Sequence, residues 1–150
     1  MIGYEGWTDE INKFVEDNTR VYPGSDEDVL TFIGRVLYQH GPDGLEDIRR
    51  FFRGGFCYYF ALMLKDAFGR GTICNNGGNG QIVWLDGTNY NTDIAYDIEG
   101  VYIDYSLLIP VSAMGKMIYD FKHVPGLSYG ASVDEIRNLV EYWKSRPAMQ

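Results

Sequence analysis

Cys57 is the residue best placed for nucleophilic chemistry. It lies two residues after the glycine pair at residues 54–55 and opens a run, residues 57–64, that is apolar on nearly every side. The run is too short to cross a bilayer, so it predicts a buried helix over roughly residues 55–69. In the first turn of a helix, free backbone N–H groups and the positive end of the helix dipole favour a thiolate. The alternative is that Cys57 simply fills space in the core, as free cysteines usually do.

Two polar residues on neighbouring strands are the candidates to act with Cys57. Residues 81–85 and 94–98 each predict a strand, and the turn residues between them favour antiparallel pairing. Side chains alternate between the two faces of a strand, so Gln81 lies on the same face as the other odd-numbered residues of its strand. In the second strand, Asp97 likewise shares a face with the odd-numbered residues of that strand. If the strands pair so that Gln81 and Asp97 face the start of the Cys57 helix, three polar groups converge there.

This organisation resembles the papain-like cysteine peptidase superfamily in its small bacterial and phage form, close to NlpC/P60 and transglutaminase-like domains. The matching segments are Gly-Phe-Cys57-Tyr-Tyr-Phe-Ala, Gln81-Ile-Val-Trp-Leu-Asp-Gly and Tyr-Asp97-Ile-Glu-Gly, which span residues 54 to about 100. The resemblance implies a nucleophilic cysteine that begins a central helix, a histidine at the start of one strand, and an acid or amide on the next. It thus implies a thiol-dependent hydrolase, amidase or peptidase with Cys57, position 81 and Asp97 as catalytic residues.

The sequence departs from that pattern where it matters most for catalysis. Gln81 stands where the family has histidine, and an amide cannot take the proton of a thiol. The remaining histidines are His40, which ends a helix before Cys57, and His123, in a segment that could fold back over the site. The sequence therefore predicts a degenerate triad, in a weak or inactive enzyme that acts as a binding protein for a protein or peptide.

Composition supports a second hypothesis of a different class. The 150-residue chain has 21 acidic and 13 basic side chains and a net charge of −8. This balance argues against binding to nucleic acid or to anionic membranes, and it permits a basic protein partner. The alternative function is therefore that of a small acidic inhibitor or interaction protein, encoded by a mobile element or phage, that binds a basic protein target. The tyrosines expected beside the predicted cleft are candidates for recognition, and at least one should be core; they are Tyr58, Tyr59, Tyr90 and Tyr96.

No metal or cofactor is expected. The two histidines are far apart in sequence, and no metal-binding spacing occurs. Five acidic residues cluster in the region of the predicted sheet, where a solvated acidic face is favoured over calcium binding; they are Asp86, Asp93, Asp97, Glu99 and Asp104. Cys57 and Cys74 make no disulfide framework, and no secretion signal is recognisable, so free thiols and a cytoplasmic location are expected.

The order of the elements predicts a single α+β domain over residues 1–150. The first 70 residues favour helices, residues 71–106 a small antiparallel sheet, and residues 107–147 further helices. Start signals are Thr8 as an N-cap, the acidic segment that Ser25 opens, and the capping box Ser132-x-x-Glu135. Other predicted features are a helix over Leu45, Ile48 and Phe52, a left-handed cap at Gly69, a hairpin tip over residues 75–80, and a helix that contains Met114, Met117, Ile118 and Phe121.

Overall fold

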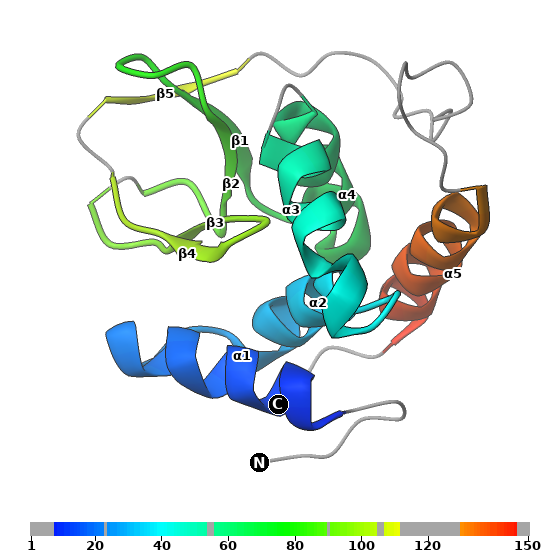
Figure 1. Cartoon of the computed structure of the whole chain (residues 1–150). Helices are drawn as coiled ribbons and strands as arrows, with labels where there is room; N and C mark the ends of the chain where they lie inside the picture. The colour runs from blue at the N-terminus through cyan, green and yellow to red at the C-terminus, as the bar shows by residue number, and fades with distance from the viewer. Residues whose placement is uncertain are drawn as a thin grey trace.

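The computed structural model describes residues 8–22, 24–53, 56–89, 91–104, 107–111 and 130–146. These residues form five α-helices, a short 3₁₀ turn and a five-stranded antiparallel sheet, the α+β class that the sequence predicts (Figure 1). The helices are α1 (Asp9–Val21), α2 (Glu27–Leu37), η1 (Pro42–Gly44), α3 (Leu45–Arg53), α4 (Cys57–Phe68) and α5 (Gly130–Ser145). The strands are β1 (Thr72–Asn76), β2 (Ile82–Leu85), β3 (Ala95–Asp97), β4 (Gly100–Tyr102) and β5 (Leu108–Pro110). No helix in this part of the chain is long and apolar enough to cross a lipid bilayer.

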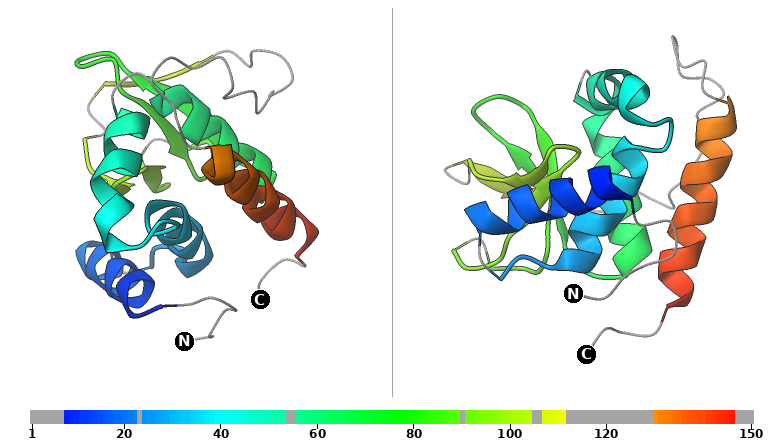
Figure 2. Two further views of the ribbon diagram at one scale, coloured as in Figure 1. Left: turned by 45° about the vertical axis from the view of Figure 1, so that its right-hand side comes forward. Right: turned by 60° about the horizontal axis from the view of Figure 1, so that its bottom comes forward.

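The helix α4 lies at the centre of the fold, as its all-round apolar sequence predicts. It packs against β2 in the middle of the sheet and against α5 on its other side (Figures 1 and 2). Its buried residues, which include Phe60, Met63 and Leu64, therefore point both to the sheet and to the helices. A helix covered from several directions needs apolar residues around most of its circumference. Gly69 ends it in the left-handed conformation, with φ of 66°, as predicted.

The sheet runs in the order β4-β3-β2-β1-β5 and encloses a second, smaller core. Ile73, Trp84 and Tyr96 belong to the main core on the side of α4. Val83 and Leu85 lie on the opposite face, where no described helix packs, yet both are fully buried. They are covered because the sheet curls over this face, as the ribbon shows (Figure 1).

A contact between two strands that are not neighbours holds the curl closed. Asn76 of β1 donates a hydrogen bond from Nδ2 to the Tyr102 hydroxyl of β4, at 2.6 Å. The same amide donates to the Asp104 carboxylate at 3.2 Å. Asn76 is 1% exposed, so these partners supply hydrogen bonds that water cannot.

Several boundaries differ from the sequence prediction. Asp26 rather than Ser25 caps α2, accepting from the Asp28 N–H, while Ser25 donates to a carbonyl in the preceding turn. The predicted loop over residues 75–80 is shorter, because β1 continues to Asn76, although residues 77–80 are the expected hairpin tip.

The C-terminal third also departs from the prediction. The region beyond residue 107 starts with β5, not with a helix, and α5 begins two residues before Ser132, which is therefore not its N-cap. The helix predicted around residues 114–121 lies outside the described residues. The apolar stripe of α5 is confirmed, since Ile136, Val140 and Trp143 are buried.

Phe32 offers a test of how the main core is held together. Its ring on α2 contacts Phe60 and Phe68 of α4 and Trp143 of α5, with centroid distances of 6.3, 5.8 and 6.4 Å. We expect Phe32→Ala to lower the free energy of unfolding by about 3–5 kcal/mol, measured by urea denaturation. Ile103→Ala is the control, because this side chain is 64% exposed and its truncation should change stability by at most about 0.5 kcal/mol. Similar losses in both variants would contradict the central role of Phe32.

Candidate functional site

Cys57 occupies the first residue of α4, as predicted, and its side chain is half-buried. The N-cap, Phe56, makes no side-chain hydrogen bond to the helix, so the amides of the first turn have no side-chain cap. The Phe56 carbonyl accepts instead from the N–H groups of Tyr59 and Phe60, at 3.1 and 3.4 Å. The N–H groups of Tyr59 and Phe60 are therefore already used within the helix.

The Cys57 sulfur contacts the backbone of the sheet. The Ile82 N–H points at Sγ with a nitrogen–sulfur distance of 3.5 Å, which suits a hydrogen bond to sulfur. This N–H is available because the β2–β3 ladder stops early. The pairs run Leu85↔Ala95 and Trp84↔Tyr96, and the next inward-facing position of β2 is Ile82. Its partner would be Ile98, which lies instead in the turn between β3 and β4, so Sγ takes the acceptor position that β3 leaves empty.

Gln81 and Asp97 are brought together, as the sequence predicts. The Gln81 amide donates from Nε2 to the Asp97 carboxylate at 3.5 Å, a long hydrogen bond. The antiparallel pairing of β2 with β3, also predicted, produces this contact.

The thiol and this polar pair are adjacent but lie on different sides of β2. Gln81 shares its parity with Val83 and Leu85, whose side chains lie in the second core, away from α4. Ile82 packs against the main core on the side of α4. Within the described residues, the only hydrogen bond found for the Cys57 sulfur is from the Ile82 N–H, and neither Gln81 nor Asp97 is seen to hydrogen-bond to it.

Asp97 is a buried carboxyl group, only 9% exposed. Burial raises the pKa of Asp97 from its ordinary value of 3.8 to about 6, and the nearby charge of Glu99 adds to that rise. Two groups act in the opposite direction: the Glu99 N–H, which donates to Asp97 at 2.8 Å, and the positive charge of Arg53.

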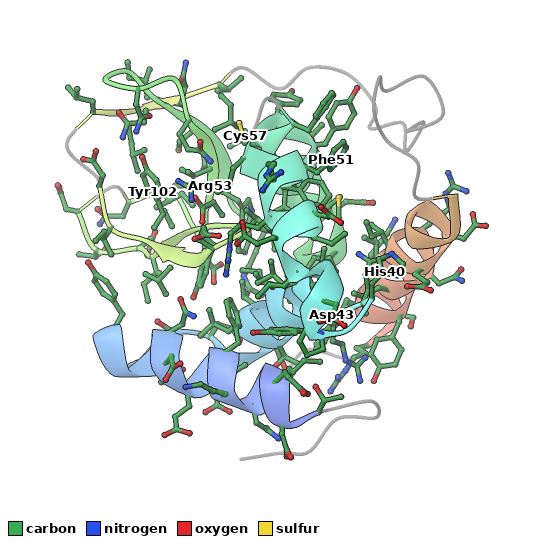
Figure 3. The ribbon with its side chains drawn as sticks, viewed as in Figure 1. His40, Asp43, Phe51, Arg53, Cys57 and Tyr102 are labelled. Carbon is green, nitrogen blue, oxygen red and sulfur yellow. The ribbon has the colours of Figure 1, made fainter. Side chains whose placement is uncertain are left out.

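Arginines of α3 form ion pairs with Glu99 in the turn between β3 and β4. Arg49 pairs with both Glu46 of its own helix and Glu99, and Arg53 lies 3.7 Å from Glu99 (Figure 3). Two of the three arginines of α3, Arg49 and Arg53, thus join this helix to the β3–β4 turn. The third, Arg50, is exposed.

The structure describes one of the two histidines, His40. His40 is exposed and lies well away from Cys57, near α5 (Figure 3). His123 lies outside the described residues, so its role as a base stays a hypothesis. Among the four tyrosines, Tyr96 is core, which confirms that at least one would be, whereas Tyr58 and Tyr59 are half-buried against the main core and Tyr90 lies outside the described residues.

Asn75 is a residue near the site that the sequence reasoning assigned to a loop. It sits in β1 directly opposite Ile82, whose N–H meets the thiol. Its Oδ1 atom is buried, and no hydrogen-bond donor in the described residues reaches it. An unpaired buried acceptor is unusual in a native structure, and here it lies on the strand next to the thiol contact. The Asn-Gly composition of residues 75–80 concealed this strand position, because it is typical of a turn.

The acidic residues of the sheet do not form the solvated face that was favoured. Asp86 binds Arg70, with 2.5 Å between Oδ1 and Nε, and Asp93 accepts from the N–H groups of Thr88 and Asn89. Asp97 is buried, as described above. Within the described part of the chain, no three histidine, cysteine or acidic side chains group closely enough to hold a metal ion.

No known protein family, curated protein or solved structure matches this chain. The resemblance to papain-like enzymes therefore rests on the residues quoted above.

The raised pKa of Asp97 predicts a pH-dependent stability. A carboxyl group whose pKa is higher in the folded than in the unfolded state favours folding when protonated. Its contribution is complete below about pH 4 and is lost as the pH rises through about 6. Asp97→Asn mimics the protonated form at every pH, so it should match the wild type near pH 4. At pH 7.5 we expect the variant to be more stable by on the order of 2–3 kcal/mol.

Urea unfolding of both proteins at half-unit steps from pH 4 to 7.5 measures this difference. Other titrating groups are common to the two proteins and cancel. A difference that does not change with pH would show that Asp97 titrates normally.

Proposed function

We propose that this chain is a non-hydrolytic binding domain of papain-like layout, which recognises a protein or peptide at the surface around Cys57. The single observation that carries the proposal is the contact of the Cys57 sulfur with the Ile82 N–H at the start of a central helix, where no proton acceptor among the described residues is seen to reach the sulfur. The Ile82 N–H is a donor to the thiol, and the preceding residue, Gln81, carries an amide, which cannot accept the thiol proton.

The proposed domain differs from a thiol enzyme because none of the described residues is seen to act as a base on the Cys57 thiol. Thiol catalysis needs a group that takes the proton of the nucleophile and returns it to the leaving group. Gln81 can hydrogen-bond but not titrate, and its amide is engaged with Asp97. Asp97 has a pKa of about 6, which would suit a base, but its described contacts are with Gln81 and Glu99 rather than with the thiol.

Apolar side chains next to the site support recognition. Leu107 and Ile109 are 52% and 56% exposed, although both are large hydrophobic residues. Ile109 lies opposite Asn75 in the β1–β5 pair, and Asn75 in turn lies opposite Ile82. The patch is therefore two strands from the thiol contact, and it adjoins the hairpin tip at Gly77. Exposed apolar groups of this kind often mark interaction sites.

An acidic interaction protein is the second candidate, and the distribution of carboxylates favours it. Exposed acidic residues lie on α1, α3 and α5, among them Asp9, Glu10, Asp47 and Glu141, while most of those on the sheet are engaged internally. A basic partner would therefore meet the helical side of the domain and not the thiol site.

The first test of the proposal is hydrolysis. We expect the wild type and Cys57→Ala to hydrolyse a fluorogenic peptide, an anilide and an activated ester at the same background rate. The reason is that a positioned base contributes about 10²- to 10⁴-fold, and none of the described residues is seen to reach the thiol as a base. Hydrolysis by the wild type that Cys57→Ala abolishes would overturn the non-hydrolytic proposal and would point to His123 as the base.

The second test is binding at the thiol surface. Peptides selected by display against the wild type should lose at least about tenfold in affinity on Ile109→Asp, because a charge in the centre of an apolar contact must be desolvated. Fluorescence anisotropy measures the affinity. Asn138→Asp on α5 is the matched control, since it adds the same charge at an exposed position on the helical side. Equal losses in the two variants would indicate that general charge repulsion, and not this surface, governs binding.

A further inference from the structure

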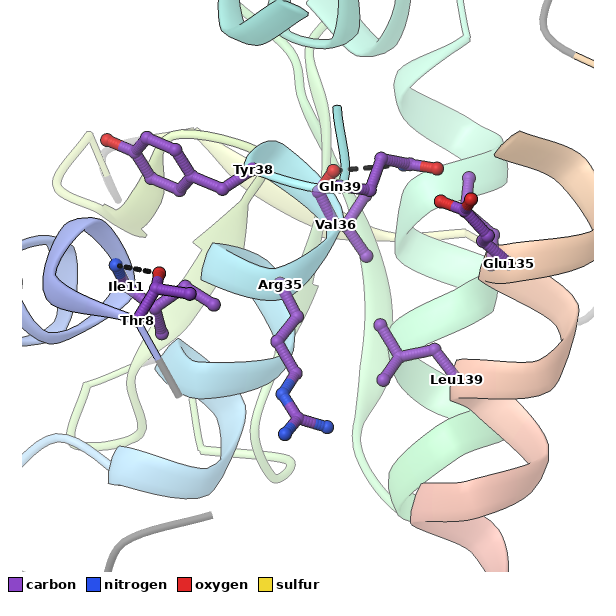
Figure 4. A pocket seen from close by; sticks show the side chains of 9 residues that line it. Thr8, Ile11, Arg35, Val36, Tyr38, Gln39, Glu135 and Leu139 are labelled. Carbon is purple, nitrogen blue, oxygen red and sulfur yellow. Dashed lines mark hydrogen bonds between the residues drawn. The ribbon is translucent and has the colours of Figure 1, made fainter. Parts of the chain in front are cut away.

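A hollow of about 310 Å³ lies between α1, α2 and α5, on the helical side of the domain and away from Cys57 (Figure 4). Its walls are aliphatic: Ile11 comes from α1, Val36 from α2, and Ile136 and Leu139 from α5. A concave site with apolar walls and a few polar groups is the usual form of a small-ligand pocket.

The polar groups at one end of the hollow are hydrogen-bond acceptors. The Gln39 amide donates from Nε2 to the Val36 carbonyl at 2.9 Å, which fixes the orientation of the amide. Its Oε1 atom is buried, and no donor in the described residues reaches it. Glu135 lines the hollow on the facing helix, and the Gln39 side chain extends toward it (Figure 4). This end therefore holds two acceptors, a carbonyl oxygen that is buried and a carboxylate on an exposed residue.

Arg35 also lines the hollow, but its guanidinium group does not point to the end where Gln39 and Glu135 lie. The Arg35 guanidinium points away from Gln39 and Glu135 (Figure 4) and lies 5.7 Å from the centroid of the Tyr142 ring. The residues after Thr8, which also lines the hollow, are the exposed acids Asp9 and Glu10. An anionic ligand would meet this negative field, whereas a cationic donor would be attracted by it.

We propose that this hollow binds an aliphatic ammonium group, with the alkyl chain against the aliphatic walls and the ammonium between Gln39 Oε1 and the Glu135 carboxylate. At about 30 Å³ for each water-sized group, the hollow holds roughly ten non-hydrogen atoms. A free alkylamine of about eight carbons fills it, and a lysine side chain of a bound protein fills about half. The proposal is independent of the function proposed for the Cys57 surface, and either can fail alone.

Three ligands with the same alkyl chain test the proposal: octylamine, octanol and octanoate. Each is titrated into the ¹⁵N- and methyl-labelled protein at pH 7 while NMR shifts are recorded. We expect octylamine to perturb Ile11, Val36, Ile136 and Leu139 and to bind most tightly, octanol less tightly, and octanoate least. Octanoate binding as tightly as octylamine, or octylamine shifting none of these residues, would overturn the proposal.

Variants of Gln39 and Glu135 test whether these two side chains bind the ammonium group. Gln39→Leu should weaken octylamine about tenfold, because it removes the hydrogen bond to a charged donor. Glu135→Gln should weaken it about two- to fivefold, as expected for a partly exposed charge pair. Asp134→Asn, which removes a charge from the neighbouring exposed residue, is the matched control and should have little effect. Equal effects of Glu135→Gln and Asp134→Asn would show attraction by net charge alone and would contradict the site.

The source of the ammonium group is decided by a further comparison. A capped Gly-Lys-Gly peptide is titrated alongside octylamine, with a capped Gly-Gln-Gly peptide as its control. Tighter binding of octylamine assigns a free amine, and tighter binding of the lysine peptide assigns a protein partner. If neither shifts the residues of the hollow, the ammonium proposal is wrong.

Discussion

The position of α4 between the sheet and α5 is the constraint on which the rest of the structure depends. The helix is short, yet it packs on β2 and on α5 at once, and rings from α2 and α5 meet its own. Such packing allows little freedom to rotate or slide, because buried side chains interlock on each side. Its first residue is consequently fixed against the start of β2, where the paired part of β3 has ended. The contact between the Cys57 sulfur and the Ile82 N–H is thus a consequence of helix packing combined with an early end to a strand pair.

The early end of the pairing between β2 and β3 also determines where the carboxylates of Asp97 and Glu99 lie. Since β3 turns at once into β4, Asp97 and Glu99 lie in or beside a tight turn, and the Asp97 carboxylate accepts the Glu99 N–H. One of the two acids points to the arginines of α3, and the other is buried beside Gln81. Arg49 and Arg53 therefore tie α3 to the sheet near a carboxyl group that stays largely desolvated. The polar pair of Gln81 and Asp97 is explained by this architecture without a catalytic role.

Features that depend on local patterns could be predicted from the sequence, and features that depend on distant contacts could not. The start of α4, the cap at Gly69 and the antiparallel pairing of β2 with β3 follow from glycine positions and apolar periodicity. The face on which Gln81 lies could not be predicted, because alternation shows which residues share a face but not which face meets a helix. The curl of the sheet depends on Asn76 and Tyr102, which are 26 residues apart, and Asn76 sits in a stretch that is typical of a turn. The strand β5 is three residues long and ends in proline, so it carries too little periodicity to be recognised.

The distribution of charge separates the domain into two surfaces with different chemistry. Most acids of the sheet are paired with arginines, accept from backbone N–H groups or are buried, so the exposed acids among the described residues lie mainly on the helices. The surface around the thiol is left with apolar groups and amides, which favour extended or apolar partners. The helical side combines a negative field with an apolar hollow that ends in acceptors, a combination that favours a cation with an aliphatic body. Because the two surfaces lie on opposite sides of α4, with α5 and the sheet as their separate scaffolds, occupation of one does not exclude the other. If both proposals hold, a domain of this size contacts two ligands at once, one at the thiol surface and one at the hollow.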